Sequence, residues 1–117
     1  MSTFMLVLQD DPKAFASDIS PAEIQAIVAQ YKAWGERLAA QGRMRGGEKL
    51  KDEGGRQLSK SRGQVRVVDG PFAEAKEVFG GYFLISADSY EQAVELCRDH
   101  PHLDYGLRID IRQVDEV

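Results

Sequence analysis

The sequence predicts a two-layer α+β sandwich that forms a homodimer. Two segments carry apolar residues at helical spacing, and short apolar runs typical of strands lie before, between and after them. Two amphipathic helices need one apolar sheet face on which to pack, which gives two layers. The inner strands are apolar on both faces, so we expect the open sheet face to meet a second copy of the chain. All 117 residues, 1–117, are expected to form a single domain.

The composition is typical of a globular protein that works in the cytoplasm. Hydrophobic residues make up 43% of the chain and charged residues 29%. The net charge of -4 argues against nucleic-acid and membrane-surface partners, because both bind basic surfaces. The single cysteine, Cys97, excludes an internal disulfide. No apolar run approaches the ~20 residues that a membrane-spanning helix needs.

The first third of the chain predicts a strand and then a long helix. Residues 3–8 are almost continuously apolar, and this short run is typical of an inner strand. Ser20 can cap a helix in which Pro21 takes the first position and Glu23 completes a capping box. Apolar side chains then recur at helical spacing as far as Gly42, which is suited to ending the helix. These side chains are Ile24, Ile27, Val28, Tyr31, Trp34 and Leu38.

Residues 43–63 predict a charged hairpin at an edge of the sheet. Leu50 and Leu58 stand among charged residues, and Gly54 and Gly55 indicate a turn. Charge at a sheet edge discourages unwanted strand pairing. This part of the chain is also its most basic: Arg43, Arg45, Lys49, Lys51, Arg56, Lys60, Arg62 and Arg66. A solvated edge explains this charge, and so does a cradle for an anionic ligand.

The last third predicts a second helix and a final strand. Residues 88–91 form a second capping box, and Pro101 ends the helix because it disfavours helical geometry at His100. His102 is expected to be exposed. In residues 107–112 apolar and charged side chains alternate, which indicates a strand with one buried face.

The connection between two apolar runs, residues 65–68 and 82–85, is the most distinctive stretch. It begins with Asp69-Gly70-Pro71-Phe72, in which Gly-Pro cannot continue a strand. Residues 73–78 have room for one or two helical turns. A strand end, a bend with a carboxylate and a short helical crossing together make a place where a site can form.

This stretch resembles the signature of the DGPF branch of the YCII-related proteins, and the resemblance extends over essentially the whole chain. The residues that carry it are Asp69-Gly70-Pro71-Phe72, Glu74, Lys76-Glu77 and Gly80-Gly81-Tyr82. The resemblance implies a ferredoxin-like fold and a dimeric α+β barrel. Most such proteins have no established activity. Many lie near genes for extracytoplasmic-function sigma factors, which implies a regulatory context.

The resemblance does not transfer a catalytic pair to this chain. YCII-like relatives outside the DGPF branch have a proposed His–Asp site, with the histidine in the first helix and the aspartate before a proline after the second. Here Tyr31 and His100 occupy those two positions. An acid/base site in this chain would therefore be a different set of residues.

Asp69, His100 and Tyr31 are the candidate catalytic residues, because no general catalytic motif is present. A carboxylate that orients an imidazole is a competent acid/base pair near neutral pH. Two simpler roles stay open: Asp69 can hold the turn, and His100 can interact with the negative end of a helix dipole.

Three functions are compatible with the sequence. The first is binding of a small, anionic metabolite in a cleft beside the motif, where a cation such as Lys76 can hold a carboxylate or phosphate. The expected ligand-binding residues are Gly70, Pro71, Phe72, Lys76 and Arg45. The second is acid/base catalysis of an isomerase, lyase or hydrolase reaction by Asp69 and His100. The third is a regulatory module that binds a protein partner. No cofactor and no metal are expected.

Overall fold

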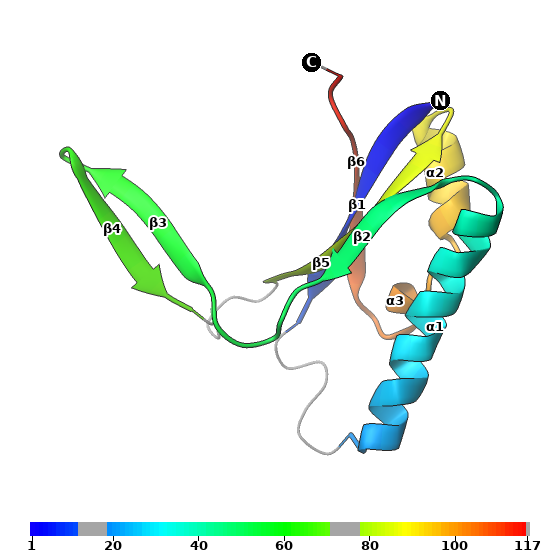
Figure 1. Cartoon of the computed structure of the whole chain (residues 1–117), viewed down its shortest axis with the longest axis horizontal. Coiled ribbons are helices and arrows are strands. Elements are labelled where there is room, and N and C mark those ends of the chain that lie inside the picture. The colour runs from blue at the N-terminus through cyan, green and yellow to red at the C-terminus, as the bar shows by residue number, and fades with distance from the viewer. Residues whose placement is uncertain (12–18, 71–77, 117) are drawn as a thin grey trace.

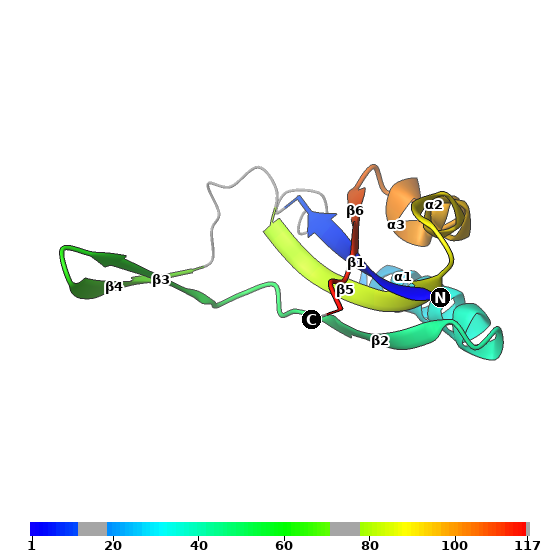
Figure 2. The ribbon, with the colours of Figure 1, turned by 90° about the horizontal axis from the view of Figure 1, so that it is seen from above.

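The computed structural model describes residues 1–11, 19–70 and 78–116, which contain six strands and three helices (Figure 1). In chain order these are β1 (Ser2–Asp10), α1 (Pro21–Ala40), β2 (Met44–Lys49), β3 (Arg56–Ser61), β4 (Gln64–Asp69), β5 (Val78–Ala87), α2 (Tyr90–Cys97), α3 (Pro101–Asp104) and β6 (Arg108–Gln113). The body of the protein is a sheet with α1, α2 and α3 on one side (Figure 2).

The main sheet has four strands in the order β2-β5-β1-β6, and every neighbouring pair is antiparallel. With α1 after β1 and α2 after β5, this strand order is the ferredoxin-like arrangement. The predicted α+β two-layer fold is therefore confirmed. The expected homodimer stays a prediction.

The core lies between this sheet and the helices α1 and α2. Buried and half-buried residues alternate along β1, so that Phe4, Leu6 and Leu8 face the helices. Met5 and Val7, on the open face of the sheet, are half-buried. The buried cluster consists of Phe4, Leu6, Trp34, Leu38, Ile85, Ala87, Ala93 and Cys97.

Helix α1 begins and ends where its sequence signals place it. The Ser20 hydroxyl accepts a hydrogen bond from the backbone N–H of Glu23 at 3.2 Å, and Pro21 is the first helical residue. After the helix, Gly42 has a φ of 71°, a left-handed conformation that glycine adopts without strain. In the part of the chain that is described, no helix is long and apolar enough to cross a membrane.

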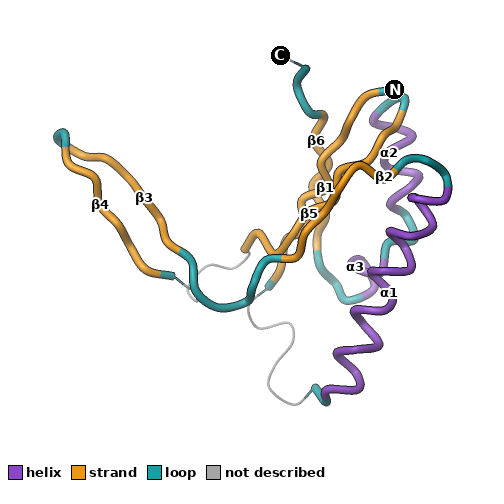
Figure 3. The backbone as a smooth tube through the Cα atoms, in the orientation of Figure 1, coloured by secondary structure: helices purple, strands orange, loops and turns teal. Residues whose placement is uncertain are grey.

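Strands β3 and β4 form a separate two-stranded sheet that projects from the body (Figure 3). The prediction of a hairpin at the edge of the main sheet is wrong, because β2 forms that edge. Gly54 and Gly55 have φ values of 88° and 102°, and they turn the chain away from the sheet after β2. The apolar residues 65–68 thus belong to the projecting hairpin and not to the core.

The projection enlarges the molecule measurably. The radius of gyration is 16.3 Å, whereas a compact domain of this length has a value of about 13 Å. We call the hairpin of β3 and β4, residues 56–69, the arm. The predicted helical crossing over residues 73–78 lies almost entirely outside the described residues, and Val78 begins β5.

Candidate functional site

A groove of about 930 Å³ lies between α1 and the β2–β5 side of the sheet. Its wall on α1 is formed by Ile24, Ile27 and Val28, which continue the apolar stripe of the helix beyond the core. Four glycines of β2 and β5 contribute to the opposite side: Gly46, Gly47, Gly80 and Gly81. Most ligand sites are apolar concavities with a few polar groups, and this groove has that character.

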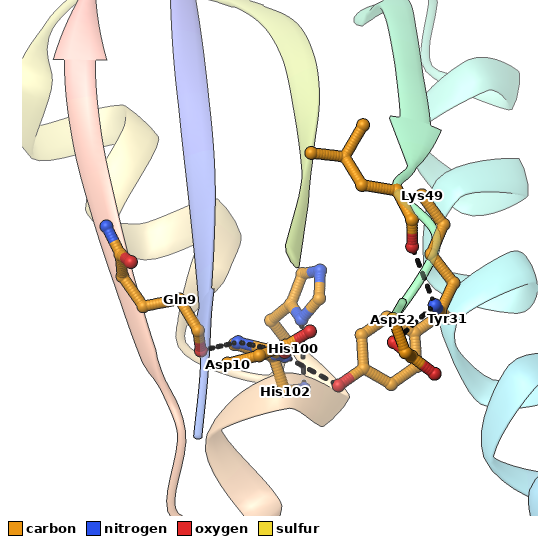
Figure 4. Close-up of polar contacts among 8 residues, drawn as sticks. Gln9, Asp10, Tyr31, Lys49, Asp52, His100 and His102 are labelled. Atoms are coloured by element: carbon orange, nitrogen blue, oxygen red, sulfur yellow. Dashed lines mark hydrogen bonds and ion pairs between the residues drawn. The ribbon is translucent and has the colours of Figure 1, made fainter. Parts of the chain in front are cut away.

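Polar side chains converge at one end of the groove, where Tyr31 of α1 meets His102 of α3 (Figure 4). The Tyr31 hydroxyl lies 2.6 Å from Nδ1 of His102. The opposite ring nitrogen, Nε2, lies 2.8 Å from the backbone carbonyl oxygen of Gln9. A carbonyl can only accept, so Nε2 carries the proton and Nδ1 accepts the hydrogen bond from Tyr31.

Burial sets the protonation states of this pair. His102 is buried, which lowers its pKa, while the hydrogen bond to Gln9 and the charge of Asp10 act in the opposite direction. Burial also raises the pKa of the Tyr31 phenol, and the negative charge of Asp10 raises it further. Near neutral pH the pair is therefore a neutral phenol that donates to a neutral imidazole.

Asp10 supplies a carboxylate beside this pair at the end of β1. Its Oδ1 lies 3.9 Å from Nε2 of His102, too far for a hydrogen bond but close enough for charge interaction. Burial raises the pKa of Asp10, whereas His102 and Lys49 lower it. The Asp10 carboxylate lies where a side chain at position 80 would stand, and only the absence of a Cβ in Gly80 leaves room for it.

His100 supports the pair from within the core and does not line the groove. Its Nδ1 accepts a hydrogen bond from the backbone N–H of His102 at 3.0 Å and so caps α3. Its ring centroid lies 4.3 Å from that of Trp34 and 5.5 Å from that of Phe83. Burial, followed by the charge of His102, lowers the pKa of His100 to about 4. His100 is therefore neutral at physiological pH.

The structure does not bring Asp69 to His100, so the predicted pair is not formed. Asp69 ends β4 in the exposed arm, where its Oδ1 lies 3.1 Å from Nε of Arg56. His100 is fully buried beneath the main sheet. The two residues are far apart because β4 belongs to the arm and not to the sheet. Of the three candidate catalytic residues, the structure places only Tyr31 in the groove.

Of the predicted ligand-binding residues, Arg45 and Gly70 are described, and neither lines the groove. The guanidinium of Arg45 donates to the backbone carbonyls of Gly42 and Met44 at an exposed position. The backbone N–H of Gly70 donates to the carbonyl of Gly55 at 2.8 Å and closes the base of the arm. Pro71, Phe72 and Lys76 lie outside the described residues, so their role in binding stays a prediction.

Sequence reasoning missed His102 and Asp10. His102 was expected to be exposed, but it is only 1% exposed because α3 folds it under α1 and against β1. The strand predicted over residues 3–8 stops short of Asp10, whereas β1 extends through it. Its position directly after an apolar strand was the one available signal. Among the described residues, no three His, Cys, Asp or Glu side chains gather as a metal site.

Residues 2–115 match the profile of the YCII-related domain. The chain belongs to the YCII-related family. A segment of 42 residues is 45% identical to the uncharacterized protein R00369 of Rhizobium meliloti (strain 1021). That segment covers 36% of this chain and 34% of the relative, so it spans about a third of the relative's length.

Among solved structures, the chain matches 5-chloro-2-hydroxyhydroquinone dehydrochlorinase (TftG) from Burkholderia phenoliruptrix AC1100, in complex with 2,5-dihydroxybenzoquinone. The match covers 97% of this YCII-related chain and 95% of the dehydrochlorinase, with 15% sequence identity and a TM-score of 0.49.

Proposed function

We propose that this YCII-related protein binds a small, mainly apolar molecule in the α1 groove and exchanges a proton with its polar end. The observation that carries this proposal is the hydrogen-bonded pair of Tyr31 and His102 at one end of an apolar groove. An apolar body would contact Ile24, Ile27 and Val28. A hydroxyl or carbonyl group at the other end of the molecule would reach the Tyr31 hydroxyl.

The charges along the groove favour a neutral ligand over the anionic metabolite expected from the sequence. The lining contains four carboxylates and two lysines: Asp10, Glu36, Glu48, Asp52, Lys32 and Lys49. Lys49 already pairs with Asp52 at 3.0 Å. An anion in this groove would meet more negative than positive charge. The anionic metabolite beside residues 69–72 stays a prediction for the part of the motif that is not described.

Tyr31 and His102 can move a proton without a cofactor. A ligand proton passes to the Tyr31 oxygen while the Tyr31 proton passes to Nδ1 of His102. The resulting imidazolium faces the Asp10 carboxylate, which stabilises its charge. Because the pKa of Tyr31 is raised, the two transfers are coupled and a free tyrosinate does not accumulate. Return of the proton to another atom of the ligand would complete an isomerisation.

Ligand screening by NMR tests the binding step. Neutral phenols and cyclic ketones are added to the wild type, and binding is mapped by shifts of the groove residues. Tyr31→Phe keeps the shape of the site but removes its hydroxyl. It should therefore weaken the binding of hydroxyl-bearing ligands and leave the binding of their deoxy analogues unchanged. Tyr90→Phe is the matched control, because Tyr90 accepts from the Gln113 N–H and does not line the groove. If no compound shifts the groove residues, the proposed binding function is wrong.

Hydrogen exchange at carbon tests the proton transfer. Bound ketones in D₂O are expected to gain deuterium beside the carbonyl faster with the wild type than with Tyr31→Phe. Equal rates of deuterium incorporation in the two proteins would mean that the protein binds ketones but does not catalyse proton transfer through Tyr31.

A further inference from the structure

One nitrogen of the buried His100 ring has no hydrogen-bond partner. The other nitrogen, Nδ1, accepts from the backbone N–H of His102 at 3.0 Å, so Nδ1 carries no proton. In the neutral ring the proton is therefore on Nε2, which is a donor. Among the described residues no group accepts from Nε2, and His100 is 0% exposed. A buried donor without an acceptor costs stability, so its presence in the core requires an explanation.

His100 lies one side chain beneath the lining of the α1 groove. Its ring centroid is 5.5 Å from those of Tyr31 and Phe83, and both of these half-buried side chains line the groove. Figure 4 shows the second nitrogen of the His100 ring on the side away from His102. The aromatic rings around it are at most weak acceptors. A movement of the Phe83 ring would therefore open Nε2 to the groove.

Gly35 provides the space for such a movement. It lies within α1 and lines the groove. A Cβ at this position would lie 3.5 Å from Cε1 of Phe83 and 3.5 Å from Cε of Met44, which is an ordinary contact distance. Alanine would thus fit without a clash, and it favours a helix interior more than glycine does. Because neither packing nor helix stability requires glycine here, the space beside Phe83 is available for its ring to turn.

The two polar ends of this region require opposite groups on a ligand. The Tyr31 hydroxyl donates its proton to Nδ1 of His102, so towards the groove its oxygen can only accept. A ligand must therefore donate to Tyr31, as a hydroxyl does. Nε2 of His100 can only donate, so a ligand must present an acceptor there, as a carbonyl does. A neutral molecule that satisfies both ends carries one hydroxyl and one carbonyl on an apolar frame.

We infer that the ligand of the α1 groove is a hydroxy ketone whose carbonyl oxygen accepts a hydrogen bond from Nε2 of His100 while its hydroxyl donates to Tyr31. The Phe83 ring turns towards Gly35 and admits the carbonyl. This inference rests on the proposed function and names the class of its ligand. It concerns binding alone, because the hydrogen bond from His100 forms without any proton transfer.

The Nε2–H proton of His100 gives a direct test in the wild-type protein. The probes are hydroxycyclohexanones, together with cyclohexanone, which lacks the hydroxyl, and cyclohexanol, which lacks the carbonyl. NMR of protein with isotope-labelled histidine follows the Nε2–H signal. Hydroxycyclohexanones and cyclohexanone should move it downfield, because the proton enters a new hydrogen bond, and cyclohexanol should not.

Two outcomes of this experiment separate the inference from the proposed function. An unchanged Nε2–H signal, while these ketones shift the groove residues, would overturn the inference and leave the proposed binding function intact. If none of the compounds shifts the groove residues, the proposed function is wrong and the inference fails with it.

Two substitutions remove the two hydrogen bonds separately. His100→Asn keeps an acceptor that can cap α3 and removes the Nε2 donor. It should weaken the binding of cyclohexanone by about three- to tenfold and leave that of cyclohexanol unchanged. Tyr31→Phe is the matched comparison, and it should weaken the binding of cyclohexanol and leave that of cyclohexanone unchanged. If His100→Asn weakens both compounds equally, His100 only maintains the shape of the groove, and the inference is wrong.

Gly35→Ala tests the path to His100 without changing a polar group. The variant should have a higher melting temperature than the wild type, because alanine favours the helix and fills the space beside Phe83. It should nevertheless bind cyclohexanone more weakly, and the Nε2–H signal of His100 should no longer move when this ketone is added. A Gly35→Ala variant in which cyclohexanone still moves that signal would overturn the proposed path.

Discussion

The hydroxyl of Tyr31 lies 2.6 Å from Nδ1 of His102, although 71 residues separate them in the chain. Helix α1 supplies the phenol and the short α3 supplies the imidazole. The carbonyl of Gln9 fixes which imidazole nitrogen carries the proton. The acid/base capacity of the groove therefore depends on three elements that only the fold brings together.

Removal of the Asp10 charge should lower the pKa of His102. The Asp10 carboxylate favours the imidazolium, while burial opposes it. Asp10→Asn eliminates the favourable interaction, so the pKa of His102 falls further below its ordinary value of about 6.5. An NMR titration of the His102 ring protons measures this shift. Asp88→Asn, at an exposed position before α2, should leave the pKa unchanged. A higher pKa in Asp10→Asn would contradict the electrostatic role given to Asp10.

Two neighbouring glycines should respond differently to alanine. A Cβ at Gly80 would overlap the carboxylate of Asp10, a flexible group that can move away. Gly80→Ala should therefore displace Asp10 and lower the pKa of His102, as Asp10→Asn does, with little loss of stability. A Cβ at Gly81 would lie 2.8 Å from the backbone oxygen of Glu48, which is fixed in β2. Gly81→Ala should cost about 1–3 kcal/mol in the free energy of unfolding.

Urea denaturation and the His102 titration together distinguish the two variants. Equal destabilisation by both substitutions, with no change in the pKa of His102, would mean that Asp10 does not occupy the space above Gly80.

The fold could be predicted because its signals are local. The capping box at Ser20 and Glu23 and the alternation in residues 107–112 each act within a few residues of chain. The arm was misplaced because the alternating apolar pattern of β4 indicates a strand but not what packs against it. Likewise, no spacing rule connects Asp10, Tyr31 and His102. These three residues meet because α3 folds under α1, and no short sequence motif indicates that packing.

Acidification should destabilise the protein through His100. The pKa of His100 is lowered to about 4 in the folded protein, whereas it is about 6.5 in an unfolded chain. Because the unfolded chain binds the proton more readily, stability is fully present above about pH 6.5 and is lost as the pH falls towards about 4. This residue contributes at most roughly 3 kcal/mol to that loss. Asp10, whose pKa is raised by burial, acts in the opposite sense at the acidic end.

His100→Asn isolates this contribution. Asparagine can still cap α3 but does not titrate, so the free energy of unfolding of the variant should depend less on pH between about 6.5 and 4. Urea denaturation at several pH values measures the slope. The same slope in both proteins would mean that His100 does not titrate differently on unfolding.

Asp69→Asn should leave the pKa of His100 unchanged. Asp69 forms an exposed ion pair with Arg56 at the base of the arm, far from the core. Loss of an exposed pair costs about 0–1 kcal/mol, so the variant should fold normally. Asp99→Asn is the matched comparison, because the negative charge of Asp99 raises the pKa of His100 and its removal should lower that pKa. NMR titration of His100 in both variants decides the matter. A fall in the pKa of His100 as large in Asp69→Asn as in Asp99→Asn would contradict this prediction. The Asp69 carboxylate would then reach His100 in solution, and the pair expected from the sequence would exist.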